Sequence, residues 1–163
     1  MDFIKEKISG IEISVNGKSK RIINIKIKEE SLDKLIFPFH KFDIMALEYK
    51  PFTRFTLAKS LDELFSNKLS KVIHSVLTDR NTGCLLIIPE VINKKFNDAF
   101  FVKLATGLAH LIGIPNFDHM SSKYYARFFV KHEDKSDSYL RKAYINMDLH
   151  TDGTYVKQKT LRI

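Results

Sequence analysis

The stretch Ile11–Lys28, IEISVNGKSKRIINIKIK, contains two short runs in which apolar and polar residues alternate. Successive side chains of a strand point to opposite faces, so each run predicts a strand with one buried face. The dipeptide Asn16-Gly17 lies between the runs and supplies the positive φ values of a tight hairpin turn. We therefore expect an N-terminal β-hairpin whose basic residues occupy outward positions, as a solvated face or a lysine-guarded edge.

Two segments further along the chain have the periodicity of helices. Thr56–Val76 carries apolar residues three and four positions apart with charged residues between them, which predicts one amphipathic helix. A second helix is expected from about Asn97 to Ile112, ended by Gly113. Apolar residues surround most of its circumference, and this pattern is typical of a helix packed on a sheet.

Three further strands are predicted. The apolar run Cys84–Ile88, closed by Pro89, indicates a buried strand. Tyr124–Val130 is rich in aromatic and β-branched residues, and Ile145–Tyr155 follows after a charged loop at His132–Lys142. The fold class is therefore α+β, mainly β, and few residues remain to cover the last strands. An open sheet of this kind favours either self-association or a fragment of a larger domain.

Length and composition limit the classes of protein that the chain can represent. The 163 residues fit one domain, and a hydrophobic content of 44% is enough for a core, which excludes a disordered polar chain. The net charge is +8, but residues 29–152 carry 17 basic against 16 acidic side chains, so the surplus lies at the two ends. No single basic stripe results, and we expect no specific nucleic-acid partner and at most weak, non-specific binding.

The cellular setting is predicted from cysteine content and the lack of targeting signals. Cys84 is the single cysteine, and its apolar neighbours predict a small buried side chain in a reducing compartment. The start of the chain, Met1–Lys7, is charged where an export signal needs an apolar block. The longest apolar stretch is interrupted by Lys103 and His110 and is too short to cross a bilayer. We expect a soluble, cytoplasmic protein with no membrane partner.

His150-Thr151-Asp152 is the pattern most suggestive of chemistry. On a strand, residues two apart project from the same face, so this imidazole and this carboxylate could bind one metal ion together. A histidine hydrogen-bonded to the neighbouring carboxylate or to backbone is the alternative, and short motifs often have such structural explanations. Gly153 follows directly and would permit close backbone approach to a ligand. A second such pair, His132 and Asp134, lies in a charged run typical of a solvated loop.

Several longer segments resemble one family in order along the chain, from about residue 11 to residue 156. The chain is similar to the glutarate 2-hydroxylases, the carbon-starvation-induced (CsiD) iron(II)- and 2-oxoglutarate-dependent dioxygenases of bacterial lysine degradation. The segments that carry the resemblance are Ala46–Phe55 (ALEYKPFTRF), Val102–Gly113 (VKLATGLAHLIG), Asn116–Asp118 (NFD), Tyr124–Phe128 (YYARF), Ser136–Arg141 (SDSYLR) and Leu149–Val156 (LHTDGTYV).

The resemblance implies a double-stranded β-helix, or jelly roll, with the hairpin and helices flanking it. It also implies Fe(II) as cofactor and 2-oxoglutarate as cosubstrate, with glutarate and O₂ converted to L-2-hydroxyglutarate, succinate and CO₂. His150 and Asp152 fall on the first two iron ligands of the family. Arg127 and Tyr125 share one predicted strand face and are candidates for contact with a dicarboxylate, although a structural ion pair of Arg127 is equally compatible. Family members are homo-oligomers.

The resemblance stops after Val156, before the family's distal histidine ligand and its 2-oxoglutarate-binding arginine. We interpret residues 1–163 as an incomplete dioxygenase domain with an aberrant basic tail at residues 157–163, produced by a frameshift or an early stop. Two ligands hold iron weakly, so we expect little or no turnover by this polypeptide alone, and oligomerisation is doubtful. The alternative function is a non-catalytic remnant or a protein-interaction module.

Overall fold

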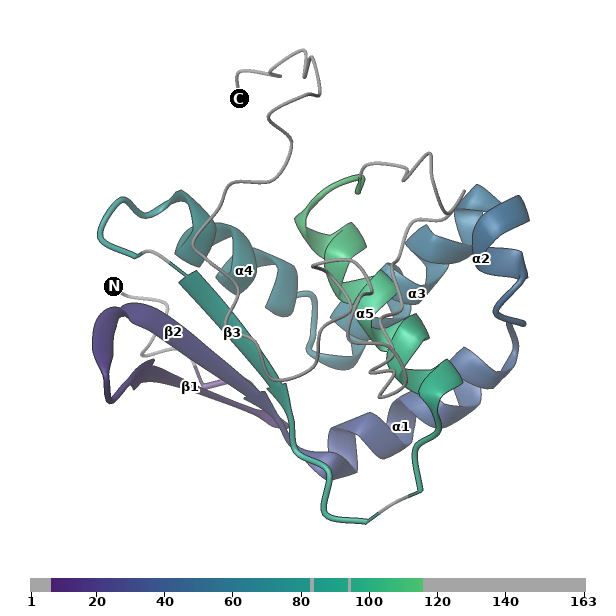
Figure 1. Cartoon of the computed structure of the whole chain (residues 1–163), viewed down its shortest axis with the longest axis horizontal. Helices are drawn as coiled ribbons and strands as arrows, with labels where there is room; N and C mark the ends of the chain where they lie inside the picture. The colour runs from purple at the N-terminus through teal and green to yellow at the C-terminus, as the bar shows by residue number, and fades with distance from the viewer. Residues whose placement is uncertain (1–6, 83, 94, 116–163) are drawn as a thin grey trace, which may run out of the picture. The chain divides into compact units, whose positions relative to one another are not determined.

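The computed structural model describes residues 7–82, 84–93 and 95–115. This part of the chain is α+β, with one small sheet and a group of helices (Figure 1). Its elements, in chain order, are β1 (Ile11–Asn16), β2 (Ser19–Ile27), α1 (Glu29–His40), α2 (Ala46–Tyr49), α3 (Pro51–Leu64), α4 (Leu69–Thr78), β3 (Cys84–Pro89) and α5 (Asp98–Ile112).

The sheet has the strand order β1-β2-β3. β1 and β2 are antiparallel, with Ile11 opposite Ile27 and Ile13 opposite Ile25, which confirms the predicted hairpin. β3 adds to the other edge of β2 in a parallel direction, and the helices α1 to α4 form the connection between these two strands. A parallel pair needs such a crossover, which explains why the helices come between its strands in the sequence.

The hairpin turn forms in a different way from the one that the sequence suggested. Within the described residues, neither Asn16 nor Gly17 is among those with positive φ. Instead the Asn16 side-chain oxygen accepts a hydrogen bond from the Lys18 amide at 2.9 Å, and its amide nitrogen donates to Asn24 at 3.3 Å. Asparagine side chains commonly close turns on the backbone two residues ahead, so the asparagine rather than the glycine defines this turn.

The helix predicted over Thr56–Val76 is wrong as a single element. The structure has two helices there, α3 and α4, separated by a short turn in which Ser66 and Asn67 both have φ of 57°. The Asp62 carboxylate accepts hydrogen bonds from the Ser70 amide at 2.9 Å and from the Ser70 hydroxyl at 2.5 Å. One carboxylate therefore supplies an acceptor for an otherwise unpaired amide in the first turn of α4.

α1 and α2 occupy a region for which the sequence predicted no element. In α1 the side chains of Leu32, Leu35 and Phe39 are buried and lie three and four positions apart, so one stripe of this helix faces the core. Pro38 lies in the last turn of the helix, close to its end at His40. α2 is a single turn with one buried residue, Leu47.

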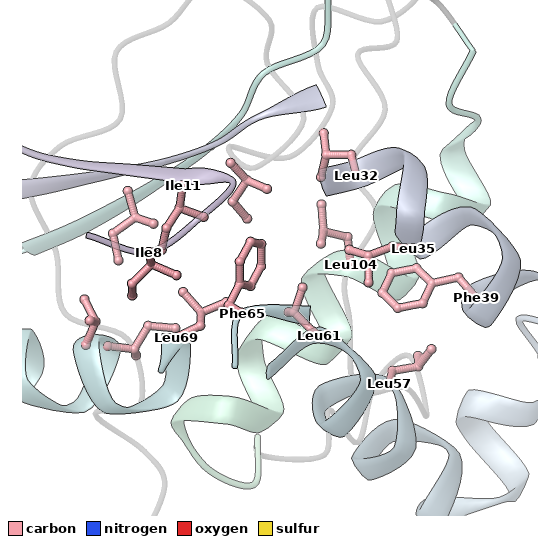
Figure 2. Close-up of a cluster of buried hydrophobic side chains, with 14 of the residues drawn as sticks. Ile8, Ile11, Leu32, Leu35, Phe39, Leu57, Leu61, Phe65, Leu69 and Leu104 are labelled. Carbon is pink, nitrogen blue, oxygen red and sulfur yellow. The ribbon is translucent and has the colours of Figure 1, made fainter. Parts of the chain in front are cut away.

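The core lies between the helices and one face of the sheet. Ile23, Ile25 and Ile27 of β2 are fully buried, and they form one cluster with the buried side chains of the helices. Figure 2 shows Phe65 between Ile11 of β1 and Leu61 and Leu69 on the helical side. The turn between α3 and α4 thus brings a large aromatic ring into the layer that joins sheet and helices.

α5 has the predicted bounds but a different packing partner. The Asn97 side chain accepts a hydrogen bond from the Phe100 amide at 2.9 Å and caps the helix, which ends before Gly113. The helix packs chiefly against α3 rather than on the sheet, and a Cβ atom at Gly107 would lie 3.5 Å from the Leu57 backbone. None of the described helices has the length and apolarity needed to span a membrane.

β3 and Cys84 also differ from the prediction. β3 is only half-buried, and the Cys84 thiol is exposed, so this cysteine is not the buried side chain that its neighbours suggested. β3 is an edge strand in the described sheet, which leaves part of its surface uncovered.

The predicted jelly roll and the mainly β character are not seen in the described part of the chain. Its one sheet is three-stranded, and helices account for more of its residues than strands do. The predicted strands at Tyr124–Val130 and Ile145–Tyr155, and the loop between them, lie outside the described residues.

Candidate functional site

The residues that the sequence proposed for chemistry all lie outside the described part. These are the metal ligands His150 and Asp152 and the substrate-contact candidates Arg127 and Tyr125. Among residues 7–82, 84–93 and 95–115, no group of three or more histidine, cysteine, aspartate or glutamate side chains could hold a metal ion. The functional groups that the structure does place are buried polar side chains along α3 and α5.

Arg54, in the first turns of α3, is buried, with 4% of its surface exposed. Its guanidinium donates a hydrogen bond of 2.9 Å from Nη1 to the Leu47 carbonyl oxygen. Leu47 lies in the single turn α2, whose carbonyl groups have few backbone partners, so the cation ties the end of α2 to α3. The segment Ala46–Phe55 that carries the family resemblance is therefore held together by an internal contact.

His110, near the end of α5, is 9% exposed and faces α3. Its Nδ1 atom lies 2.8 Å from the Thr106 carbonyl oxygen, and the Phe55 ring meets the imidazole edge-on at 5.2 Å between centroids. Its Nε2 atom is buried without a hydrogen-bond partner in the described structure. Burial lowers the pKa of His110 below its usual 6.5, the carbonyl contact opposes this, and the charge of Arg54 lowers the pKa further. At neutral pH both the burial and the charge of Arg54 favour the uncharged imidazole, and the carbonyl oxygen beside Nδ1, which can only accept, places the ring proton on that nitrogen.

Lys103, in the middle of α5, is 8% exposed. Its Nζ atom donates a hydrogen bond of 2.9 Å to the carbonyl oxygen of Phe39, in the last turn of α1. A cation is favourable at the carboxyl end of a helix, so this contact joins α5 to the end of α1. Burial lowers the pKa of the Lys103 ammonium, and the negative charge of Asp43 opposes that shift.

A cavity of about 120 Å³ adjoins Lys103, between α1 and the start of α5. Its lining combines three phenylalanine rings with a few polar and cationic side chains. The lining residues are Ile36, Phe39, His40, Lys95, Phe96, Asn97, Ala99, Phe100 and Lys103. Apolar walls with a small number of polar groups are a combination that this cavity shares with small-molecule sites.

Sequence reasoning assigned no role to Arg54 and did not identify Lys103 or His110 as buried polar groups. A signal was present, because Lys103 and His110 interrupt an otherwise apolar stretch at positions seven apart, hence on one side of a helix. A polar residue on the apolar side of a helix needs a partner in the core, and the structure supplies a carbonyl oxygen for each.

Comparison with known proteins gives a consistent result over nearly the whole chain. The CsiD family model matches residues 11–162. A glutarate 2-hydroxylase of Klebsiella pneumoniae (strain 342) is 44% identical over 151 residues, which cover 93% of this chain and 46% of the relative. The glutarate 2-hydroxylases of Salmonella typhimurium (strain SL1344) and Salmonella newport (strain SL254) are each 40% identical over 159 residues, covering 98% of this chain and 49% of theirs.

The chain therefore spans about half the length of the curated relatives it matches. Within that span the similarity includes the helical segments Ala46–Phe55 and Val102–Gly113 and the stretch around His150 and Asp152. With a family model that matches more than nine-tenths of its residues, the chain belongs to the CsiD family.

Proposed function

We propose that this chain forms part of an iron(II)- and 2-oxoglutarate-dependent dioxygenase that hydroxylates glutarate at C2. The observation that carries the proposal is identity of 40–44% to proteins named glutarate 2-hydroxylase along almost all of the chain. The small-molecule partners would be two dicarboxylates, glutarate and 2-oxoglutarate, and a cytoplasmic location would suit that chemistry.

His150 and Asp152 are the proposed iron ligands. An imidazole nitrogen and a carboxylate oxygen form a donor set that suits Fe(II) and leaves coordination positions open for a cosubstrate, so these two residue types fit the metal. Bound iron would supply the oxidation chemistry, and the protein would position both dicarboxylates beside it. The resemblance provides two ligands within residues 1–163, and the third would have to come from outside this sequence.

Arg127 and Tyr125 are the proposed substrate contacts. A guanidinium can donate two parallel hydrogen bonds to one carboxylate, and a phenol can donate a third. The expected role is binding and orientation of the dicarboxylate, so Arg127→Met would raise the glutarate concentration needed for any turnover.

The experiment measures metal binding and turnover on the same polypeptide. Mn²⁺ added to isotope-labelled protein should broaden the His150 ring signals and the backbone amide signals of the neighbouring Thr151 and Gly153 at millimolar metal, because two ligands bind weakly. Succinate formation from 2-oxoglutarate should be low and should depend on both Fe(II) and glutarate. His150→Ala should abolish the broadening of the Thr151 and Gly153 amide signals, whereas His132→Ala, in the charged run, should leave it unchanged.

Two results would contradict parts of this proposal. Selective broadening of the Thr151 and Gly153 amide signals that persists in His150→Ala would show that this histidine is not a metal ligand. Succinate formation that equals that of a full-length relative would refute the two-ligand assignment while supporting the dioxygenase class. An equal rate of 2-oxoglutarate turnover with and without glutarate would show that glutarate is not the substrate.

A further inference from the structure

The cavity between α1 and α5 is lined by both buried and exposed residues. Phe39, Phe100 and Lys103 are buried, and we call these three the floor of the cavity, whereas Ile36 and His40 are exposed, so the cavity opens to solvent. A closed apolar cavity of about 150 Å³ accepts benzene. With a volume of about 120 Å³, this one suits a ligand of about six heavy atoms.

The Lys103 ammonium brings a positive charge to this floor without a negative partner in contact. It donates to one neutral acceptor, the Phe39 carbonyl oxygen, and no carboxylate within the described residues forms an ion pair with it. Asp43 acts on it only through its electric field. Burying an ammonium group costs free energy because the group loses its water, and one hydrogen bond to a neutral carbonyl offsets only part of that cost. An anion at the cavity floor would offset more of it.

The other cation of the cavity is already paired. Lys95 Nζ lies 2.7 Å from the Asp33 carboxylate, and both side chains are partly exposed. The charge available to a ligand is therefore the single charge of Lys103. A ligand with one negative group matches this better than a dianion does.

The walls of the cavity are aromatic. The Phe100 ring lies 4.6 Å from the Phe96 ring and 5.5 Å from the Phe39 ring, measured between centroids. Phe39 lies at the opposite end of the core cluster from Ile8, away from the hairpin (Figure 2). These rings offer apolar contacts to a short hydrocarbon chain and no hydrogen-bonding groups.

From this combination we infer that the cavity binds a short aliphatic monocarboxylate. Its carboxylate accepts a hydrogen bond from Lys103 Nζ, and its methylene groups lie against the rings of Phe39, Phe96 and Phe100. The inference goes beyond the proposed dioxygenase function, because it requires neither iron nor 2-oxoglutarate. The competing explanation is that Lys103 serves only to stabilise the end of α1.

Two-dimensional NMR titration of the full chain with butyrate and with n-butanol, in the absence of iron, separates these explanations. Butyrate has a four-carbon chain and one negative charge, and n-butanol has the same chain without the charge. We expect saturable shifts at Phe39, Phe100 and the Lys103 side chain with butyrate, at a millimolar dissociation constant. Binding of n-butanol should be at least about tenfold weaker, since the ammonium gains no charged partner.

Three variants locate the site. Ala99→Leu fills the cavity from within α5 and keeps the bond between Lys103 and Phe39, so it should abolish the saturable shifts. Lys103→Met removes the charge and should weaken butyrate binding at least about tenfold. Lys71→Met removes an exposed lysine of α4 and should leave binding unchanged.

Several outcomes would overturn the inference. Absence of saturation with butyrate up to about 100 mM would exclude a specific site. Equal affinity for n-butanol would mean that Lys103 does not recognise the carboxylate, and unchanged binding in Ala99→Leu would place the ligand elsewhere. If Lys103→Met does not fold, Ala99→Leu and the n-butanol comparison still decide. Because the titration contains no iron, a failure to bind butyrate would overturn this inference without bearing on the proposed hydroxylation of glutarate.

Discussion

At the scale of single residues, His110 illustrates how a titratable group is held neutral inside a helical layer. Nδ1 donates to the Thr106 carbonyl oxygen one turn earlier on the same helix, and Phe55 covers the ring edge-on. Arg54 adds a repulsive positive charge from α3. Protonation of the imidazole would therefore place a second cation in a buried position.

This arrangement predicts that the folded chain loses stability in mild acid. The pKa of His110 is lowered in the folded state, so between that lowered value and 6.5 the unfolded chain binds more protons than the folded chain. Unfolding is then increasingly favoured as the pH falls below about 6.5, and the contribution of His110 is fully present above that value. Urea unfolding midpoints at pH 7.5 and 5.5 should show the loss.

Two variants test whether His110 causes this pH dependence of the urea midpoint. His110→Gln removes the titrating ring, so the difference between its two midpoints should be smaller than that of the parent chain. His74→Gln, at an exposed position of α4, should retain the parent's difference. An equal pH dependence in the parent and in His110→Gln would refute the assignment of this effect to His110.

At the scale of elements, the turn between α3 and α4 decides how the helices reach the core. Ser66 and Asn67 adopt left-handed backbone conformations, and the Asn67 amide donates to the Asp62 carbonyl oxygen at 2.9 Å. Asparagine tolerates this conformation better than serine does, so the strain is concentrated at Ser66.

Ser66→Gly should therefore stabilise the fold. Glycine avoids the left-handed penalty of about 1–2 kcal/mol for a residue with a Cβ atom, and it costs roughly 0.5–1 kcal/mol in backbone entropy. The net expectation is a gain of about 0.5–1 kcal/mol in the free energy of unfolding, measured by urea denaturation.

The same substitution inside a helix gives the opposite sign. Ser60→Gly lies in the interior of α3, where glycine is a poor helix former, and should cost about 0.5 kcal/mol. If Ser66→Gly destabilised the chain as much as Ser60→Gly does, the turn would not store the proposed strain.

This turn also shows why the sequence predicted one helix where two exist. Leu61, Phe65, Leu69 and Val72 keep the spacing of a single amphipathic helix, and all four are buried. Periodicity records which side chains face the core, but the tertiary contact between Asp62 and Ser70 that ends one helix and starts the next leaves no periodic signal. By contrast, α5 was predictable at both ends, because Asn97 caps it locally and Gly113 follows it.

At the scale of the whole molecule, the charge is distributed unevenly. The net charge is +8, and most of the surplus lies at residues 1–28 and 153–163. In the described hairpin Lys20 and Arg21 are exposed, whereas Lys26 pairs with Glu90 at 2.7 Å. In the described hairpin, these exposed basic side chains are thus interrupted by a cation that is paired with a carboxylate.

Binding to duplex DNA should accordingly be weak and governed by salt. We expect retention on DNA-cellulose at about 50 mM salt and release by about 200 mM, because few phosphate contacts form. Removing the three basic residues of the tail with Lys157→Ser, Lys159→Ser and Arg162→Ser should shift elution to lower salt. Retention that resists salt or depends on base sequence would contradict this expectation.

The proposed metal ligands could be predicted from the sequence, whereas the cavity between α1 and α5 could not. The family was recognisable because several segments resemble it in order, and the metal ligands His150 and Asp152 stay a prediction that rests on that resemblance. The cavity could not be predicted, because it depends on the distance between α1 and α5, which meet through Lys103 and Phe39, 64 residues apart. Nothing in local periodicity encodes such a long-range contact.

The parallel pairing of β2 with β3 has a consequence for folding during translation. Ile22 of β2 is paired with Cys84 of β3, which is synthesised roughly sixty residues later, so the central strand has no partner on that edge until then. Pairing the two strands closes a long loop at an entropic cost. The hairpin and the helices can form while translation continues, but the isoleucines of β2 keep one backbone edge unoccupied during that interval. A nascent chain of this protein thus exposes an unpaired apolar strand edge, and that interval is when a chaperone would matter most.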